Sequence, residues 1–261
     1  GSDPRTSLPF YKYTGFNILD SMHRYIGPLQ AKLYSALLPS KSNYSKIYDW
    51  SEKLTSSVAI VEPSDPNINK IASIWKKTTF PLKIFSLYRN TDFWRWRYLE
   101  SEGYNYLFFG DPESTGVIVA RVEDIISKDK LELNGRKVFR IIEIIPNSDT
   151  AWLGEVDFNL VGLLKGAIKW ASNQECVAVD FYCSTKKFEN TLFEVGLKKF
   201  DINDTLCSLA VLFQPLKHME NTINVFCKVN VEGLDSTDVF FDNTYMVKSD
   251  GDMDRPNIPK R

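Results

Sequence analysis

The chain has 261 residues and a formal net charge of −1, with 32 basic against 33 acidic side chains. This length indicates one large domain or two small ones, and the hydrophobic share of 43 % supports a sizeable core. The even charge balance argues against a nucleic-acid-binding protein, which usually carries a clear basic excess. No apolar run reaches the roughly 18–20 residues that a membrane-spanning helix needs.

The four cysteines stand at positions 176, 183, 207 and 227, without a C-x-x-C pair and with only two histidines in the chain. They are therefore expected to be reduced, mostly buried thiols of a cytoplasmic protein, and no metal site is predicted. Gly1 and Ser2 are typical of residues left by cloning, so the natural polypeptide is expected to begin elsewhere.

Residues 3–57 are the least regular part of the chain. The segment FYKYTGFNILDSMHRYIGPL predicts a helix end, a turn or cap at Gly15 and a strand around Ile18–Ile26. The segment QAKLYSALLPS predicts a short amphipathic helix that stops at Pro39. The polar and aromatic stretch KSNYSKIYDWSEKL is suited to connect two modules.

A more regular pattern begins at Ser57. SVAIVEP predicts a strand, and DPNINKIASIWKKT predicts a helix with Asp65 as its N-cap and Pro66 at its first position. SLYRNTDFWRWRYLESEG predicts a second helix, which is capped by Thr91 and closed by Gly103. YNYLFFGD and TGVIVARVED then predict a hairpin around the turn DPESTG.

A strand–helix–strand unit follows the hairpin. The sequence predicts a strand over Val138–Ile145, a helix over LVGLLKGAIKWAS, a strand over Cys176–Thr185 and a helix that ends at Gly196. LKKF, CSLAVLFQPL, TINVFCKV and VFFDNTYMV predict further strands. Up to residue 216 the order β-α-α-β-β-β-α-β-α-β-β predicts an α/β (α+β) fold, a mixed sheet flanked by helices with extra C-terminal strands. The parallel β-α-β unit places a helix N-terminus beside a strand end, a corner that can bind phosphate.

This order of elements resembles the GCN5-related N-acetyltransferase (GNAT) family, whose sheet splays between its fourth and fifth strands to admit acyl-CoA. EVGLKKF resembles the helix end that this family often shows before its last hairpin, and FYKYTGF looks like the same ending of a preceding module. SDGDMDRPN resembles the DxDxDRPN ending of acetyltransferase-like proteins from bacterial surface-polysaccharide gene clusters. The resemblance implies the C-terminal half of a tandem protein. Residues 1–57 would then end a preceding unit and form a linker, 58–216 would be a GNAT-like domain, and 217–261 a strand extension and tail.

The resemblance also implies acetyl-CoA or another acyl-CoA as cofactor, bound near Ile145, Asn147, Gly154 and Ser184. The family pattern before the central helix is Arg/Gln-x-x-Gly-x-Gly/Ala, whereas this chain has NSDTAWLGEVDFNLVG, with no basic residue between Arg140 and Lys165. Negative charge opposes a pyrophosphate there, at Asp149, Glu155 and Asp157. A remodelled CoA site, and a CoA site only in the other half of the tandem, both stay open.

Two residues are predicted to be catalytic, Glu143 and Tyr182. Glu143 is expected on the same strand face as Phe139, Ile141 and Ile145, where apolar neighbours would raise its pKa and suit a general base. The alternative is a structural glutamate paired with Arg140 or Lys137. Asp180, Tyr182 and Ser184 alternate along one strand, so they are expected to share one face. There Tyr182 could protonate a leaving thiolate; the alternative is a solvated or hydrogen-bonded face without a ligand.

The substrate-binding prediction rests on the helix TDFWRWRY. Aromatic rings beside arginines suit a sugar ring with a phosphate, so the site is expected to include Trp94, Arg95, Arg97, Tyr98 and Asp180, with Asp254 and Arg255 of the tail. The alternative is a core face whose arginines pair with glutamates. The alternating aspartates Asp250, Asp252 and Asp254 lack the remaining ligands of a calcium loop, so they are expected to cap turns.

Two functions of different classes remain possible from the sequence. The first is an acyl-CoA-dependent N-acyltransferase, expected to be an N-acetyltransferase, that modifies an amino group of a sugar nucleotide or polysaccharide precursor. The second is a catalytically silent GNAT-like module that binds a glycan or a partner protein. Aminoacyl transfer from tRNA is disfavoured, because it calls for a basic face and the net charge is −1.

Overall fold

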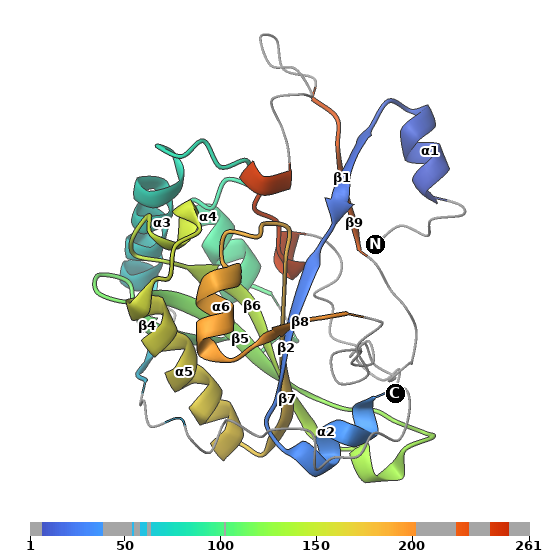
Figure 1. Ribbon diagram of the computed structural model, residues 1–261. Coiled ribbons are helices and arrows are strands. Elements are labelled where there is room, and N and C mark those ends of the chain that lie inside the picture. Colours follow the sequence, from blue (N-terminus) through green and yellow to red (C-terminus); the bar gives the residue numbers. More distant parts are fainter. Residues whose placement is uncertain are drawn as a thin grey trace.

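The computed structural model describes residues 7–38, 54, 58–61, 64–101, 103–201, 223–229 and 241–250. Its centre is a seven-stranded mixed sheet (Figure 1). In chain order the strands of this sheet are β2 (His23–Pro28), β3 (Ile60–Val61), β4 (Leu107–Asp111), β5 (Gly116–Asp124), β6 (Lys137–Ile145), β7 (Cys176–Cys183) and β8 (Lys198–Lys199). They lie side by side as β3-β4-β5-β6-β7-β2-β8. A second, two-stranded sheet pairs β1 (Asn17–Ser21) with β9 (Asn224–Cys227).

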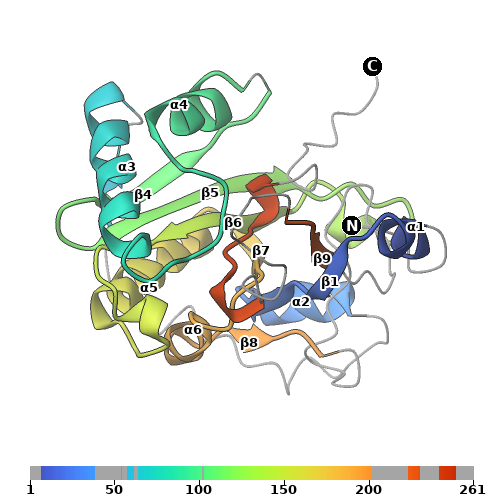
Figure 2. The same ribbon diagram turned by 90° about the horizontal axis from the view of Figure 1, so that it is seen from above.

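Helices cover both faces of the large sheet, as Figure 2 shows for α3 and α4 against α5. The α-helices are α1 (Ser7–Tyr13), α2 (Ala31–Leu37), α3 (Asp65–Thr79), α4 (Thr91–Trp94), α5 (Phe158–Asn173) and α6 (Glu189–Val195). The predicted fold class, a mixed α/β sheet flanked by helices, is therefore confirmed. Among the helices of the described ranges, none has the length and apolar character to cross a membrane.

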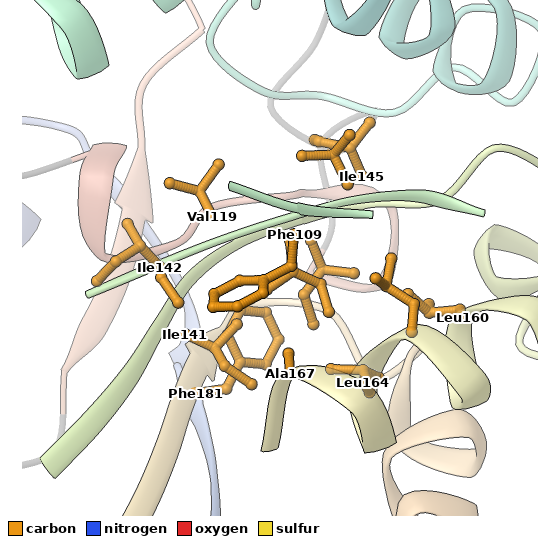
Figure 3. Packing of buried hydrophobic residues seen from close by; sticks show 14 of the residues in the cluster. Phe109, Val119, Ile141, Ile142, Ile145, Leu160, Leu164, Ala167 and Phe181 are labelled. Atoms are coloured by element: carbon orange, nitrogen blue, oxygen red, sulfur yellow. The ribbon is translucent and has the colours of Figure 1, made fainter. Parts of the chain in front are cut away.

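The main core lies between the sheet and α5. Apolar residues recur along α5 at helical spacing, and most of them are buried. Figure 3 shows how strand and helix side chains meet there (Phe109, Ile141 and Phe181 against Leu160, Leu164 and Ala167). All six side chains are buried, so this contact fixes the position of the sheet relative to α5.

β6 and β7 run parallel but separate towards their C-terminal ends. Their pairing extends from Lys137↔Cys176 to Ile141↔Phe181, although β6 continues to Ile145 and β7 to Cys183. The splayed fourth and fifth strands expected from the resemblance are therefore present. This gap between the strand ends is called the splay below.

A bulge changes the faces of β6. The register between β5 and β6 shifts between Val119 and Ala120, opposite Glu143 and Ile141. Because one extra residue reverses the alternation of side chains, Ile141 points towards α5 whereas Ile145 lies on the other side of the sheet (Figure 3). The prediction that Glu143 shares a face with Phe139 and Ile141 was therefore wrong, since Glu143 bonds to the α4 side of the molecule.

Most predicted helices are present, with corrections at their ends. α3 begins at Asp65, and Ser64 rather than Asp65 is its N-cap. The second predicted helix is shorter than expected: α4 is four residues long and continues as one π-helical turn, η3 (Arg95–Leu99). Its N-cap is Asn90, not Thr91, because the Asn90 side chain accepts from the Phe93 N–H at 2.9 Å.

The N-terminal strand differs most from its prediction. Residues around Ile18–Ile26 form two strands, β1 and β2, which belong to different sheets. β2 lies inside the large sheet between β7 and β8, so the sheet includes a strand from the first 57 residues.

Of the strands predicted after residue 200, one is wrong in its described part and another cannot be compared with the structure. In VFFDNTYMV the part from 241 on forms a 3₁₀ turn, η7 (Phe241–Asn243), and isolated bridges at Thr244 and Val247, so the strand prediction was wrong there. CSLAVLFQPL lies outside the described residues.

Candidate functional site

The splay is filled by residues 244–250, called here the C-terminal strap. Val247 forms an antiparallel bridge with Cys183 of β7. The Ser184 N–H donates to the Met246 carbonyl at 2.9 Å, and the Met246 N–H donates to the Ser184 hydroxyl at 2.9 Å. The Ser184 hydroxyl also donates to the Thr244 carbonyl. The strap is therefore hydrogen-bonded to the end of β7, and Figure 2 shows it crossing the middle of the molecule.

Tyr245 ties the same strap to β6. Its hydroxyl accepts from the Ile144 N–H at 3.2 Å and donates to the Ile144 carbonyl at 3.0 Å. Its ring is fully buried and lies 5.4 Å from the ring of Trp75 and 5.0 Å from that of Trp152. Burial raises the pKa of Tyr245, so the hydroxyl keeps the proton that it donates. Beyond Ile141, where β6 no longer pairs with β7, the backbone of β6 is thus hydrogen-bonded to the strap at Ile144.

A buried charged cluster, called the Arg89 cluster, links the strap to β6 and to the residues just before α4. Arg89 Nε donates to Glu143 Oε1 at 2.8 Å, and its Nη2 donates to the Asp250 carboxylate at 2.6 and 2.8 Å. The second oxygen of Glu143 accepts from Tyr98 at 2.8 Å and from Ser249 at 3.2 Å. The side chains of Arg89, Glu143 and Asp250 all have 0 % exposure, so one cation serves two carboxylates out of contact with water.

Burial raises the pKa of Glu143, although Arg89 and the hydrogen bond from Tyr98 favour its charged form. A raised pKa is what the sequence predicts for a general base. However, both carboxylate oxygens already accept hydrogen bonds, and the structural partner is Arg89 rather than the expected Arg140 or Lys137. The catalytic role of Glu143 stays a prediction.

A second cluster, called the Asp180 cluster, lies where β2, β6 and β7 run side by side. Asp180 Oδ2 accepts from Arg24 at 3.1 Å and from Arg140 at 3.4 Å, and it lies 3.6 Å from Lys248 Nζ. Burial opposes ionisation of Asp180, but Lys248, Arg140 and Arg24 together hold its pKa well below its usual range. Three buried cations therefore surround one carboxylate, and the strap supplies one of them.

Tyr182 lies on the same side of β7 as Asp180. Lys248 Nζ is 4.3 Å from the centre of the Tyr182 ring, and the Arg24 guanidinium carbon is 5.2 Å from it. Burial raises the pKa of Tyr182 to about 12, so its hydroxyl carries a proton at neutral pH. The predicted polar face is present, but Asp180, Tyr182 and Ser184 are all buried rather than solvated. A role as proton donor stays a prediction.

The corner that would hold a CoA pyrophosphate is occupied by a carboxylate. Asp157 caps α5, and its Oδ1 accepts from the N–H groups of Asn159 and Leu160 at 3.0 and 3.1 Å. Its Oδ2 accepts from the Ser148 hydroxyl at 2.7 Å. The same backbone donors cannot also bind a phosphate, and the negative charge repels one. With the strap in the splay, the residues present therefore do not fit acyl-CoA.

Replacing Asp157 with alanine is expected to lower the free energy of unfolding by about 1 kcal/mol, because two N–H groups at the start of α5 lose their acceptor. Urea unfolding measures this. Asp149, an exposed carboxylate of the same loop, is the control, and Asp149→Ala should change the free energy of unfolding little. Equal effects of the two substitutions would contradict the capping role.

The predicted substrate-binding helix is mostly core. Trp94 is fully buried, donates its indole N–H to the Arg89 carbonyl at 3.1 Å and stacks on Tyr98 at 5.1 Å. Arg97 Nε donates to the Ser249 carbonyl of the strap at 3.2 Å. Arg95 instead points to the surface and pairs with Asp65 at 3.1 Å. The structure thus brings Arg97 and Tyr98 to the strap and places Arg95 away from it.

The four residues predicted to bind the cofactor contact different parts of the fold. Ile145 ends β6 opposite Val117 of β5, and the Asn147 amide donates to the Glu113 carbonyl at 2.8 Å. Gly154 has a φ of +86° and accepts from the Asn190 amide at 2.8 Å. Ser184 bonds to the strap as described above. The predicted substrate residues Asp254 and Arg255 lie outside the described residues.

Sequence reasoning did not identify four residues that are central to the strap and to the two clusters. They are Arg24, Arg89, Tyr245 and Lys248. Arg89 and Asp250 are separated by 161 positions, so no local pattern links them. For the arginines, the only signal in the sequence was that each stands alone beside an apolar strand or helix. That pattern does not show which carboxylate each arginine pairs with.

The comparisons with known proteins give low similarity. No protein-family model matches the chain, and no curated protein matches it. A crystal structure of a GCN5-related N-acetyltransferase from Anabaena variabilis ATCC 29413 is 13 % identical with a TM-score of 0.39, over 69 % of this chain and 37 % of that one. A conserved protein of unknown function from Enterococcus faecalis V583, described as a probable N-acyltransferase, is 14 % identical with a TM-score of 0.39, over 77 % of this chain and 40 % of that one. The chain spans about two fifths of the length of these structures, and similarity this low says nothing about ligand or activity.

Proposed function

We propose that this chain is a catalytically silent, GNAT-like module that acts by binding a partner. The observation that carries this proposal is the strap, whose Tyr245 hydroxyl bonds to both backbone groups of Ile144 inside the splay. The Asp157 cap at the start of α5 supports it independently, because it takes the donors that a pyrophosphate would use. The proposed location is the cytoplasm, in line with the free thiols of Cys176, Cys183 and Cys227.

Acetyl-CoA is expected not to bind the folded chain. Calorimetry and thermal unfolding at about 1 mM acetyl-CoA measure this, since a Kd of about 10 μM would stabilise the fold by about 2.7 kcal/mol. For a chain of this size that gain raises the Tm by roughly 5–10 °C. Neither heat nor a Tm shift should appear, and a clear shift would overturn the silent assignment.

The second candidate is an N-acyltransferase that modifies an amino group of a sugar nucleotide or polysaccharide precursor. It is favoured by the buried charge, because desolvation costs several kcal/mol per ion and stability alone does not require such clusters. In this candidate Glu143 would take the proton of the amine, and Arg24 and Arg140 beside Asp180 would face the phosphates. It requires the strap to leave the splay first.

If the folded chain binds acetyl-CoA, the N-acyltransferase becomes the better supported of the two functions. Glu143→Gln and Tyr182→Phe should then lower turnover of amino-sugar nucleotides more than they lower affinity. Unchanged turnover in both variants would remove these two residues from the site.

A further inference from the structure

A helix–glycine–strand unit occurs twice in the structure. α1 is followed by Thr14, Gly15 and β1, and α6 is followed directly by Gly196 and then by β8, so the two helices end one residue apart relative to the glycine. Both helices have seven residues, and the two glycines have φ values of +82° and +101°. In each unit the glycine N–H bonds to the carbonyl three residues earlier, at 3.0 and 2.9 Å, and the next N–H bonds to the carbonyl five residues before it, at 2.9 and 3.0 Å. The two helix ends are therefore built in the same way.

The strands that follow have equivalent partners. Two residues after each glycine, Asn17 pairs with Cys227 and Lys198 pairs with Ile26; one residue later, Ile18 pairs with Phe226 and Lys199 pairs with Tyr25. Both pairings are antiparallel. Phe226 of β9 therefore holds the place of Tyr25 of β2. Each ring also packs on its helix: Phe226 stacks on Tyr11 at 4.0 Å, and Tyr25 lies edge-on to Phe193 at 6.3 Å.

The two units differ in what covers them. α6 buries Thr191, Leu192 and Val195 against the rest of the fold, whereas α1 buries none of its residues. Phe10, which corresponds to the buried Thr191, is 62 % exposed. β2 has β7 on its second edge, but the second edge of β9 pairs with no strand of the described residues (Figure 1). A two-stranded sheet of this kind has little stability of its own in water.

We infer that α1, β1 and β9 complete the sheet of a second acetyltransferase-like unit, which lies N-terminal to this one in the same polypeptide. There β9 would hold the place that β2 holds here, with a strand of that unit antiparallel to its second edge. Each unit would then receive one strand from the other: β2 from the N-terminal side and β9 from the C-terminal side.

A second copy of this chain does not fit that surface. Its own α6 and β8 already occupy the positions that α1 and β1 would have to enter, and β2 already lies beside β7. The partner must instead be a sheet that lacks its last helix and strand. This interface depends on the repeat and not on whether the splay admits acyl-CoA.

Two neighbouring aromatic residues of α1 provide a matched test. Phe10 corresponds to buried Thr191, whereas Tyr13, 90 % exposed, corresponds to Glu194, which is also exposed. In the present chain both Phe10→Ala and Tyr13→Ala should leave the Tm unchanged within about 2 °C. In the longer natural polypeptide, Phe10→Ala should lower the Tm of the upstream unit by roughly 5 °C or more, because a ring buried there would be lost, while Tyr13→Ala should not.

Hydrogen exchange gives a readout that does not depend on any substitution. The amides of Asn224–Cys227 should exchange at least about tenfold more slowly in the longer polypeptide than in the present chain, since the second edge of β9 becomes paired. Equal exchange in both proteins, or equal effects of Phe10→Ala and Tyr13→Ala in the longer one, would overturn this interface. A natural polypeptide without an α/β unit upstream would overturn it as well.

Discussion

Replacing Arg89 with methionine should destabilise the fold by about 3–5 kcal/mol, a large part of the stability of an ordinary domain. The guanidinium is fully buried and bonds to Glu143 and to Asp250, so its loss leaves two buried carboxylates without a cation. Methionine preserves much of the volume and the contact with Trp75, whose ring centre lies 4.7 Å from the guanidinium carbon. The effect is therefore one of charge rather than of packing. Urea unfolding followed by circular dichroism measures it.

The control is an arginine on the neighbouring helix. Arg95 pairs with Asp65, but the two side chains are 39 % and 61 % exposed, so Arg95→Met should cost less than about 1 kcal/mol. Adding Glu143→Gln and Asp250→Asn to Arg89→Met should restore part of the loss, because the stranded charges are then removed. If Arg89→Met costs no more than Arg95→Met, the buried pair is not formed in solution.

The cost of Arg89→Met should depend on pH. Burial already raises the pKa of Glu143, and losing the arginine raises it further. A carboxyl whose folded pKa exceeds its unfolded value of about 4.3 binds more protons in the folded state, so stability falls as pH rises. The difference in free energy of unfolding between Arg89→Met and the parent protein should be smallest near about pH 4 and grow towards neutral pH. The lowered pKa of Asp180 makes stability rise with pH instead, but this contribution is the same in both proteins and cancels in the difference.

The order of elements could be predicted because it depends on local patterns. Alternation identified β4 to β7, helical spacing identified α3 and α5, and Gly196 marked the end of α6 with a φ of +101°. The insertion of β2 between β7 and β8 could not be predicted, since antiparallel pairing over such a distance leaves no periodic signal. The same holds for Glu143: a one-residue bulge, invisible in the sequence, turned it towards Arg89.

The candidate site could be predicted only as a set of residue types. The acidic, glycine-poor loop before α5 indicated a corner unsuited to phosphate, and in the structure Asp157 of this loop accepts the first free N–H groups of α5. That the chain itself fills the splay was not visible, because Tyr245 belongs to a segment with strand-like alternation and meets Ile144 across 101 positions. Burial and contact across the chain, rather than residue identity, decide which charged groups remain accessible.

Tyr245→Ala should also cost about 3–5 kcal/mol, because it removes a fully buried ring that packs on Trp75, Trp152 and Phe188. Tyr245→Phe keeps the ring and removes only the hydroxyl. It should cost about 1–3 kcal/mol, since the N–H and carbonyl of Ile144 then stay buried without that partner. Tyr88, 56 % exposed, is the control, and Tyr88→Phe should change stability by less than about 0.5 kcal/mol.

The same variants decide whether the strap is a permanent part of the core. If it is, unfolding of Tyr245→Ala stays a single transition with a lower midpoint, and acetyl-CoA at about 1 mM still gives no Tm shift, because Asp157 continues to occupy the start of α5. If the strap instead covers a working cleft, loosening it should let acetyl-CoA raise the Tm of the variant but not of the parent protein. If acetyl-CoA raises the Tm of Tyr245→Ala but not that of the parent protein, the silent assignment is wrong. The strap contacts would then be the reason that the parent protein does not bind acetyl-CoA.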